Sequence, residues 1–384
     1  MTPTVPCVLA NSFTKCLDEK RLTIVVIGNS VSYGAAFDGD KIDSYYVYLA
    51  DWFRETFPLA SIDVRLGIIF AIGPEVQLFR MEDKALKFQP DLVVTEFGAA
   101  NGAWGERGRE ITERATEGYV RRLRALRPEA DVLMNLGLQE RMMEDYREGH
   151  TPNSVLFQER VARHYGCALT DSGTAIARRV LAGEPWRRYM NDSIHPGPQG
   201  YAVHGQTIRE ELDRQYRAYQ GLGARARAVK PHPLPATTLL PDPWVLPRQV
   251  PAGAAELQGF QPGVSGRVSY VEAAGPGASG SFTAAGGRIV GLLYQFQSEA
   301  EDERQAELEV RLDGAEAWTR LPRNEPVFPE EDDRENLFQR QFFGAYHLPL
   351  YCRRLDFRVV SEDGSAQNTP SLRLVSFFVV DAPD

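Results

Sequence analysis

Residues 22–28 read LTIVVIG, and Asn29, Ser30 and the run VSYG at 31–34 follow directly. A continuous apolar, β-branched run of this length is typical of a strand that is buried on both faces of a parallel sheet. Its carboxyl end is the edge at which ligands bind in open α/β folds. The glycines on either side of Ser30 permit a tight turn there. We therefore expect the functional site to begin at Ser30.

The first half of the chain continues as alternating strands and helices. Further strands are predicted at 62–67, 91–98, 131–137 and 167–170, and helices at 43–57, 110–126, 155–165 and 200–219. Strands that alternate with helices indicate a parallel sheet that is covered on both faces. The sequence therefore predicts an α/β catalytic domain over residues 20–220.

The pattern changes after residue 220. Residues 221–263 are rich in proline, glycine and alanine, which predicts an extended linker on the surface. Short alternating runs that turn residues separate follow at 266–272, 280–285, 288–297, 306–312, 341–349, 354–360 and 371–380. These runs predict an all-β, sandwich-like accessory domain at 264–384.

Composition narrows the possible partners. The chain has 384 residues and a formal net charge of −9, so nothing in its overall charge favours nucleic acid or an anionic membrane. The basic run at 121–127 is interpreted as a solvated helix face. No apolar stretch is long enough to span a membrane. No secretory signal is visible, so the default location is cytoplasmic, although a secreted chain after signal removal would look the same.

The four cysteines do not indicate a metal site. Cys7, Cys16, Cys167 and Cys352 form no CxxC pair and have no histidine at ligand spacing, so we predict neither zinc nor any other cofactor. Cys7 and Cys16 could pair in an oxidising compartment, but reduced thiols are favoured. The oligomeric state is not predicted.

Two polar segments point to nucleophilic chemistry. Ser30 follows the first strand at the predicted start of a helix, where free N–H groups favour negative charge. Taken alone, it fits a helix-capping serine at least as well. Asp192 and His195 lie three residues apart in the turn NDSIHPGPQGY, just before the last helix. In that position Asp192 can orient the imidazole, and His195 can take a proton from Ser30.

Other residues at the same edge of the sheet can stabilise an oxyanion. Asn101 follows the third strand, and its amide is a possible donor; Gly73 follows the second strand and offers an unobstructed N–H. Both residues also fit ordinary turns. Gly67 lies six residues before Gly73 and is an alternative to it.

The order Ser, Gly, Asn, Asp-x-x-His resembles the SGNH hydrolase family, also called GDSL-like esterases, over about residues 20–220. The resemblance implies a flavodoxin-like three-layer α/β/α sandwich with a five-stranded parallel sheet. It also implies roles for five residues, namely Ser30 as nucleophile, Asp192 and His195 as the rest of a triad, and Gly73 and Asn101 as oxyanion donors beside the Ser30 amide. Two departures stand out, Asn29 where the family has Asp and GAANG at 98–102 where it has Gly-x-Asn-Asp.

This resemblance leads to a functional hypothesis. We expect a serine esterase that hydrolyses a small acyl ester, in particular acetyl, on a carbohydrate or other small molecule through an acyl-enzyme. Asn29, Trp104 and Trp186 are candidate substrate contacts, although the tryptophans fit ordinary packing equally well. Two alternatives remain open at this point, an O-acyltransferase that uses the same site and a glycan-binding protein whose site has lost catalysis.

Overall fold

The computed structural model describes residues 7–34, 42–69, 73–97, 105–223, 227–265, 268–296, 306–321, 339–342, 351–361 and 372–381. The chain divides into two compact units, which we call the α/β unit and the β unit. The α/β unit comprises Met1–Gly105 and Thr112–Pro243, and the β unit comprises Glu106–Ile111 and Trp244–Asp384.

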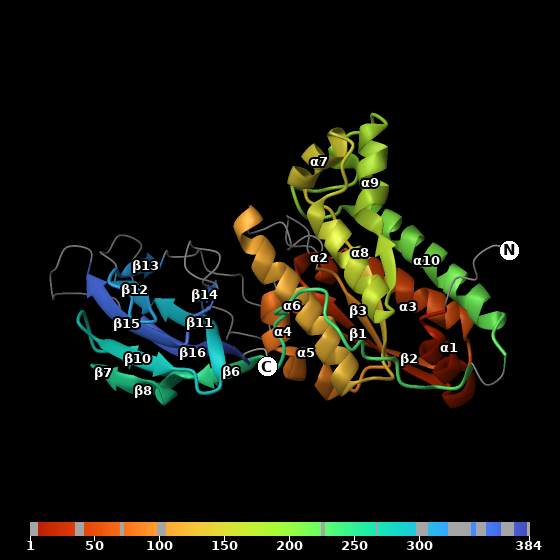
Figure 1. Cartoon of the computed structure of the whole chain (residues 1–384). Helices are drawn as coiled ribbons and strands as arrows, with labels where there is room; N and C mark the ends of the chain where they lie inside the picture. Colours follow the sequence, from red (N-terminus) through yellow and green to blue (C-terminus); the bar gives the residue numbers. More distant parts are fainter. Residues whose placement is uncertain are drawn as a thin grey trace. The chain divides into compact units, whose positions relative to one another are not determined.

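A five-stranded parallel sheet forms the centre of the α/β unit (Figure 1). Its strands are β1 (Arg21–Gly28), β2 (Ser61–Ile68), β3 (Leu92–Thr95), β4 (Asp131–Leu136) and β5 (Ala168–Asp171). The spatial order is β2-β1-β3-β4-β5, the flavodoxin-like arrangement. All residues of β3 and β4 are buried, as their continuous apolar runs require. The predicted fold class is confirmed.

Helices cover both faces of this sheet. The helices α1 (Ala10–Thr14), α3 (Tyr45–Thr56) and α10 (Pro198–Gln220) share one hydrophobic core with β1, β3, β4 and β5. On the other face lie α6 (Gly105–Leu126) and α8 (Asn153–Tyr165) (Figure 1). Shorter helices flank the sheet edges, namely α2 (Ser30–Tyr33), α4 (Pro74–Phe79), α5 (Met81–Lys84), α7 (Met143–Arg147) and α9 (Ser172–Leu181).

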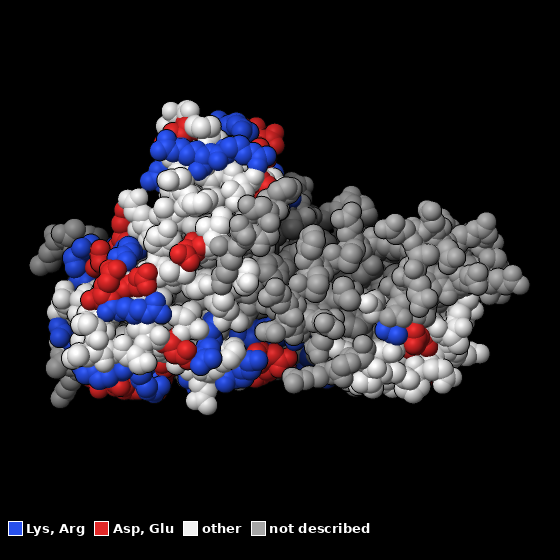
Figure 2. Space-filling model, turned by 180° about the vertical axis from the view of Figure 1, so that it is seen from behind, with Lys and Arg blue, Asp and Glu red and all other residues white. Residues whose placement is uncertain are grey.

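The basic run at 121–127 is not the solvated face that we expected. Arg124 is only 1% exposed, and its guanidinium donates to the carbonyl oxygens of Ala130, Tyr165 and Gly166. Arg121 donates to the carbonyl oxygen of Pro235 at 2.9 Å. These arginines hold loops in place because each guanidinium offers five donors in a planar fork. On the face seen in Figure 2, basic and acidic side chains lie side by side over the lower described surface, and a mainly basic band lies at the top.

The predicted linker contains ordered structure. Residues 227–243, which we call the strap, belong to the α/β unit. The carboxylate of Glu117 on α6 accepts the N–H groups of Leu239 at 2.6 Å and Leu240 at 2.9 Å. At the other end of the strap, His232 Nε2 lies 2.7 Å from Asp131 Oδ1. The strap is therefore extended, as its prolines predict, and fixed to buried carboxylates.

The β unit consists of two antiparallel sheets. Their strand orders are β13-β12-β15-β10-β7 and β14-β11-β16-β9-β8, and β6 also pairs with β16. The strands are β6 (Arg248–Pro251), β7 (Glu256–Gln258), β8 (Phe260–Ser265), β9 (Val268–Ala273), β10 (Ser279–Thr283), β11 (Gly287–Phe296), β12 (Ala306–Leu312), β13 (Thr319–Leu321), β14 (Gln339–Phe342), β15 (Arg354–Ser361) and β16 (Leu372–Asp381). Strands β6, β7 and most of β8 fall within 248–263, which we had assigned to the linker.

One hydrophobic core joins these two sheets. Phe282 of β10 stacks on Phe377 of β16 with 4.1 Å between ring centroids. Val310 and Phe357 from the first sheet and Leu292 from the second belong to the same cluster and are at most 1% exposed. A core that is filled from two facing sheets defines a β-sandwich, as the alternating runs predict.

Candidate active site

Ser30 lies at the first position of α2, directly beyond β1. The residue before it, Asn29, is the N-cap, and its side chain accepts the Val31 N–H at 3.0 Å. The alternative interpretation of Ser30 as a helix cap is therefore wrong. Gly28 is required at the turn because a Cβ there would lie 2.0 Å from Ser32 Oγ. The cap and the glycine together leave the Ser30 hydroxyl available for another partner.

That partner is His195. Its Nε2 lies 2.8 Å from Ser30 Oγ, although 165 residues separate the two in the sequence. On the other side of the ring, His195 Nδ1 lies 2.7 Å from Asp192 Oδ2. A carboxylate beside Nδ1 keeps the proton on that nitrogen, so Nε2 can accept the serine proton. The arrangement can therefore transfer a proton from the hydroxyl to the imidazole.

The Asp192 carboxylate is held by its own loop. Its Oδ1 accepts the N–H groups of Ile194 at 2.7 Å and His195 at 2.6 Å. Burial alone raises the pKa of Asp192, but the hydrogen bonds from the His195 backbone, the His195 ring and the Ile194 backbone outweigh it, so this pKa lies below its usual range. Asp192 is thus ionised at neutral pH and can stabilise a protonated His195.

Contacts from outside the loop fix its backbone. The Trp186 indole N–H donates to the Asp192 carbonyl oxygen at 2.8 Å. The Glu140 N–H, on the segment that follows β4, donates to the Ser193 carbonyl oxygen at 2.8 Å. Trp186, which we predicted as a substrate contact, thus has its polar edge turned to the loop, and it packs against a buried cluster around α9.

The predicted oxyanion donors fall in different surroundings. Gly73 is the N-cap of α4, and its N–H donates to Glu75 Oε1 at 3.0 Å. Gln77, one turn later, donates to the carbonyl oxygen of Gly28, which places the start of α4 beside the end of β1. Asn101 and Trp104 lie outside the described residues.

The alternative glycine, Gly67, has a packing role. It lies within β2, opposite Ile27 of β1. A Cβ at Gly67 would lie 2.1 Å from the Lys84 carbonyl oxygen, so the position requires glycine for close approach of α5. The assignment of Gly73 as the oxyanion glycine stays a prediction.

Sequence reasoning missed two residues that border the site. Glu75 is 1% exposed and holds the Gly73 amide; a glutamate just after a helix N-cap is the available signal. The Tyr201 hydroxyl donates to the Val31 carbonyl oxygen at 2.8 Å and so fixes α2, the helix that begins at Ser30. A tyrosine six residues after the catalytic histidine candidate carries no signal for this contact.

A second histidine, His204 on α10, is buried beside the rings of Tyr45 and Tyr201. His204 is 0% exposed, and Asn135 Nδ2 lies 3.1 Å from its Nδ1. Burial lowers the pKa of His204 to about 3, so its ring is neutral. This placement agrees with a packed residue rather than a second base.

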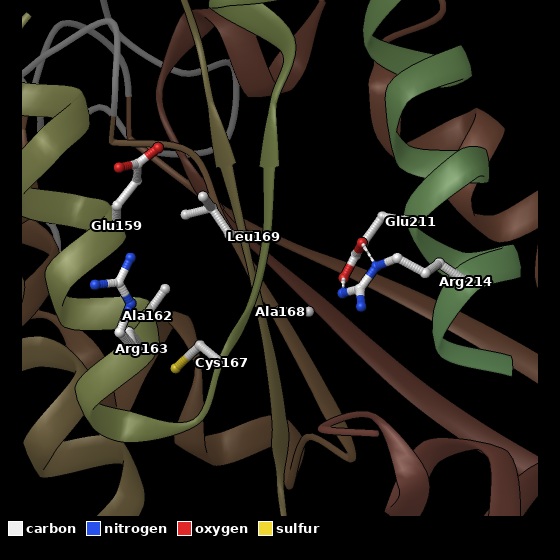
Figure 3. Close-up of a pocket in the computed structure, with 8 residues that line it drawn as sticks. All are labelled: Glu159, Ala162, Arg163, Cys167, Ala168, Leu169, Glu211 and Arg214. Carbon is white, nitrogen blue, oxygen red and sulfur yellow. Dashed lines mark hydrogen bonds and ion pairs between the residues drawn. The ribbon is translucent and has the colours of Figure 1, made fainter. Parts of the chain in front are cut away.

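No other site among the described residues offers comparable chemistry. The described part of the chain contains no group of three or more His, Cys, Asp or Glu side chains that is arranged to hold a metal ion. A cavity of about 290 Å³ lies along β5 between α8 and α10, lined by Cys167 and by charged residues of both helices (Figure 3). Strand β5 is three strands from β1, or about 14 Å. Burial raises the pKa of the Cys167 thiol, which disfavours its nucleophilic form.

The fold and this site define a hydrolase-type α/β unit, with a serine, a histidine and an aspartate joined at the carboxyl edge of a flavodoxin-like sheet. Residues 26–203 match the model of the GDSL-like Lipase/Acylhydrolase family. This match supports a carboxylic-ester hydrolase as the class of the α/β unit. No helix in the described ranges has the length and apolar character needed to cross a bilayer.

Solved structures share the whole two-unit architecture. A two-domain esterase active on acetylated mannans, co-crystallised with mannopentaose, aligns with a TM-score of 0.70 and 19% identity over 98% of this chain and 97% of that one. The structure of a two-domain esterase with the same described activity gives 0.70 and 20% over 97% and 96%. A mutant acetylxylan esterase from Geobacillus stearothermophilus covers 50% of this chain, with a TM-score of 0.42 and 15% identity. Curated proteins gave no match.

Proposed function

We propose that this chain is a serine esterase that removes acetyl groups from a polysaccharide, with Ser30 as nucleophile, His195 as general base and acid, and Asp192 as the residue that orients His195. One observation carries the proposal. The hydroxyl, the imidazole and the carboxylate form a continuous chain of hydrogen bonds of 2.8 and 2.7 Å. These are the distances over which a base takes a proton from a nucleophile.

Acylation begins when Ser30 Oγ attacks the ester carbonyl carbon. His195 Nε2 takes the hydroxyl proton as the new C–O bond forms, and Asp192 stabilises the imidazolium. The carbonyl oxygen becomes an oxyanion, and we assign the Ser30 N–H at the start of α2 as one of its donors. When the tetrahedral intermediate collapses, the bond to the sugar oxygen breaks. That oxygen takes the proton from His195, and acetyl-Ser30 remains.

Deacylation reverses these roles. His195 Nε2 takes a proton from water, and the hydroxide formed attacks the acetyl carbonyl carbon. The bond to Ser30 Oγ then breaks, Oγ recovers its proton from His195, and acetic acid leaves and ionises to acetate in solution. No group beyond the chain and water is needed for atoms and charges to balance.

We propose an acetylated polysaccharide as the substrate because of the two-unit architecture of the chain. The esterase described as active on acetylated mannans matches this chain over nearly its full length, including the β unit. A β-sandwich attached to an esterase unit is consistent with a polymeric substrate, since a second unit can contact sugars away from the scissile ester.

The decisive test is Ser30→Ala, with acetate release from p-nitrophenyl acetate and from acetylated mannan as the assays. Loss of the nucleophile should lower kcat by at least about 10⁴-fold. Ser61→Ala, an exposed serine at the start of β2, is the matched control and should retain wild-type turnover. A fluorophosphonate probe should label wild type and Ser61→Ala at Ser30, and should fail to label Ser30→Ala. Wild-type turnover in Ser30→Ala would refute the proposal.

Product analysis separates hydrolysis from transfer. Acetate should appear in equal amount to the deacetylated sugar hydroxyls, with or without an added acceptor sugar. Acetylated acceptor in place of acetate would instead identify an O-acyltransferase.

A further inference from the structure

One of the contacts that hold the loop of Asp192 and His195 comes from a side chain six residues before Asp192. Residue Trp186 lies in a short 3-10 helix (Trp186–Arg188), and its Nε1–H donates to the Asp192 carbonyl oxygen at 2.8 Å. Asp192 is therefore held at two points, since its carboxylate accepts the Ile194 and His195 N–H groups and its carbonyl accepts the indole.

We propose that Trp186 is a positioning residue for the esterase reaction and that its indole N–H, through the Asp192 carbonyl, sets the distance between the Asp192 carboxylate and His195. This inference rests on the proposed function of Ser30, His195 and Asp192. It assigns to Trp186 a role in orienting the base, in place of the substrate contact that the sequence suggested.

The geometry supports this role because few other contacts fix the peptide plane at Asp192. Within the loop, the Asn191 N–H donates to the His195 carbonyl oxygen at 2.8 Å and closes the turn. The next carbonyl oxygen, that of Ser193, is held by the Glu140 N–H at 2.8 Å. Between these two points, the Arg187 guanidinium donates to the Asn191 carbonyl oxygen and the Trp186 indole donates to the Asp192 carbonyl oxygen. A change of ψ at Asp192 would redirect the chain that follows it and so move His195 relative to the Asp192 carboxylate.

The indole ring is itself well anchored. Trp186 packs against the buried cluster that includes Ile176 of α9 and Val203 of α10. A ring that is held by packing keeps its N–H fixed at little entropic cost. Misplacement of a catalytic group by a fraction of an ångström can change rate strongly, because proton transfer needs close heavy-atom approach.

The test replaces the indole with a ring that lacks the donor. Trp186→Phe keeps the packing and removes the N–H. We expect kcat for p-nitrophenyl acetate to fall about tenfold, with KM within twofold of wild type, because the substrate does not touch the lost group.

A matched control separates positioning from general destabilisation. The Trp52 indole N–H donates to Asp213 Oδ1 at 2.8 Å, a bond of the same length to an aspartate on α10 away from the candidate site. Trp52→Phe should lower the melting temperature and leave kcat unchanged. If Trp52→Phe loses kcat to the same extent as Trp186→Phe, the loss reflects stability, and the positioning role is overturned.

A spectroscopic readout tests the proposal without turnover. The proton shared by His195 Nδ1 and Asp192 Oδ2 should give a low-field ¹H resonance, assigned by its absence in His195→Gln. It should shift or broaden in Trp186→Phe and stay in place in Trp52→Phe. An unchanged resonance with unchanged kcat in Trp186→Phe overturns the proposal. Failure of the esterase assignment itself would appear separately, as wild-type turnover in Ser30→Ala.

Discussion

The buried carboxylate that holds the strap gives a strong quantitative prediction. Glu117 is 0% exposed and lies on α6. Its Oε1 accepts the Tyr165 hydroxyl at 2.8 Å and the Leu239 N–H at 2.6 Å, and its Oε2 accepts the Leu240 N–H at 2.9 Å. Glu117→Gln preserves the shape of the side chain but places an amide NH₂ where one acceptor oxygen stood. We expect a large loss of stability with no direct effect on the hydrolytic site.

The magnitude follows from these three bonds. A hydrogen bond to a charged group contributes about 1.5–3 kcal/mol, and a neutral one about 1 kcal/mol. In Glu117→Gln the carbonyl oxygen keeps two bonds in weaker form, and the third becomes a contact between two donors. The net cost is at least about 2.5 kcal/mol, the lower end of these three losses taken together. For a domain of 150–250 residues, each kcal/mol lowers the melting temperature by about 2–4 °C. The α/β unit should therefore melt at least about 5 °C lower.

Two measurements check this prediction. Thermal unfolding gives the shift, and hydrogen exchange read by mass spectrometry should show faster exchange of the Leu239 and Leu240 amides. The Lys230 amide, which donates to Asn11 Oδ1 at 3.1 Å, should keep its protection as an internal control. Glu55→Gln removes a charge from an exposed pair with Arg209 and should leave the melting temperature nearly unchanged. A shift below about 2 °C in Glu117→Gln, or unchanged exchange at Leu239 and Leu240, would refute the anchoring role.

Two further predictions concern titratable groups near the site. Burial lowers the pKa of His204 to about 3, whereas an unfolded histidine has a pKa near 6.5. As the pH falls below about 6.5, the unfolded state therefore binds a proton at His204 and the folded state does not. The free energy of unfolding of wild type should therefore drop by about 2 kcal/mol more than that of His204→Gln between pH 7 and pH 5; urea unfolding at both pH values measures this, and parallel behaviour would contradict it. Glu75→Gln removes a carboxylate from the Gly73 amide. If that amide faces the oxyanion, kcat/KM should rise at least about tenfold, because tenfold corresponds to only about 1.4 kcal/mol of the roughly 4 kcal/mol by which like charges about 4 Å apart repel at an effective dielectric constant of about 20. Unchanged kcat/KM would exclude Gly73 as an oxyanion donor.

The sheet of the α/β unit was predictable because its signal is local. Each strand is a short apolar run that ends in a polar or turn residue, and the alternation with helices determines parallel pairing. The run at 22–28, for example, lies within β1, which is Arg21–Gly28 in the structure. The short helices α4 and α5 were missed because six and four residues provide too little periodicity to detect.

The contacts of the strap could not be predicted from local sequence patterns. Proline content predicts an extended connection, but composition contains no information on what the connection contacts. The partners of the strap, Glu117 and Asp131, lie more than 100 residues earlier in the sequence. Strands β6 and β7 were missed for a related reason. They have only four and three residues and lie near prolines, so their sequence resembles coil, and their strand conformation depends on hydrogen bonds from neighbouring strands.

The candidate site combines both kinds of information. The Asp192–His195 contact spans three residues, so the turn alone suggests it, whereas the contact between His195 and Ser30 depends on the sheet order that brings α2 and the last loop together. Once the sheet is predicted, the second contact follows, because both segments lie at the same edge. Trp186 is different. Its ring can stack on a sugar, pack in a core or donate from its N–H, and only the position of the Asp192 carbonyl decides among these uses. Residues that orient a site through the backbone therefore escape sequence reasoning even where the reacting groups do not.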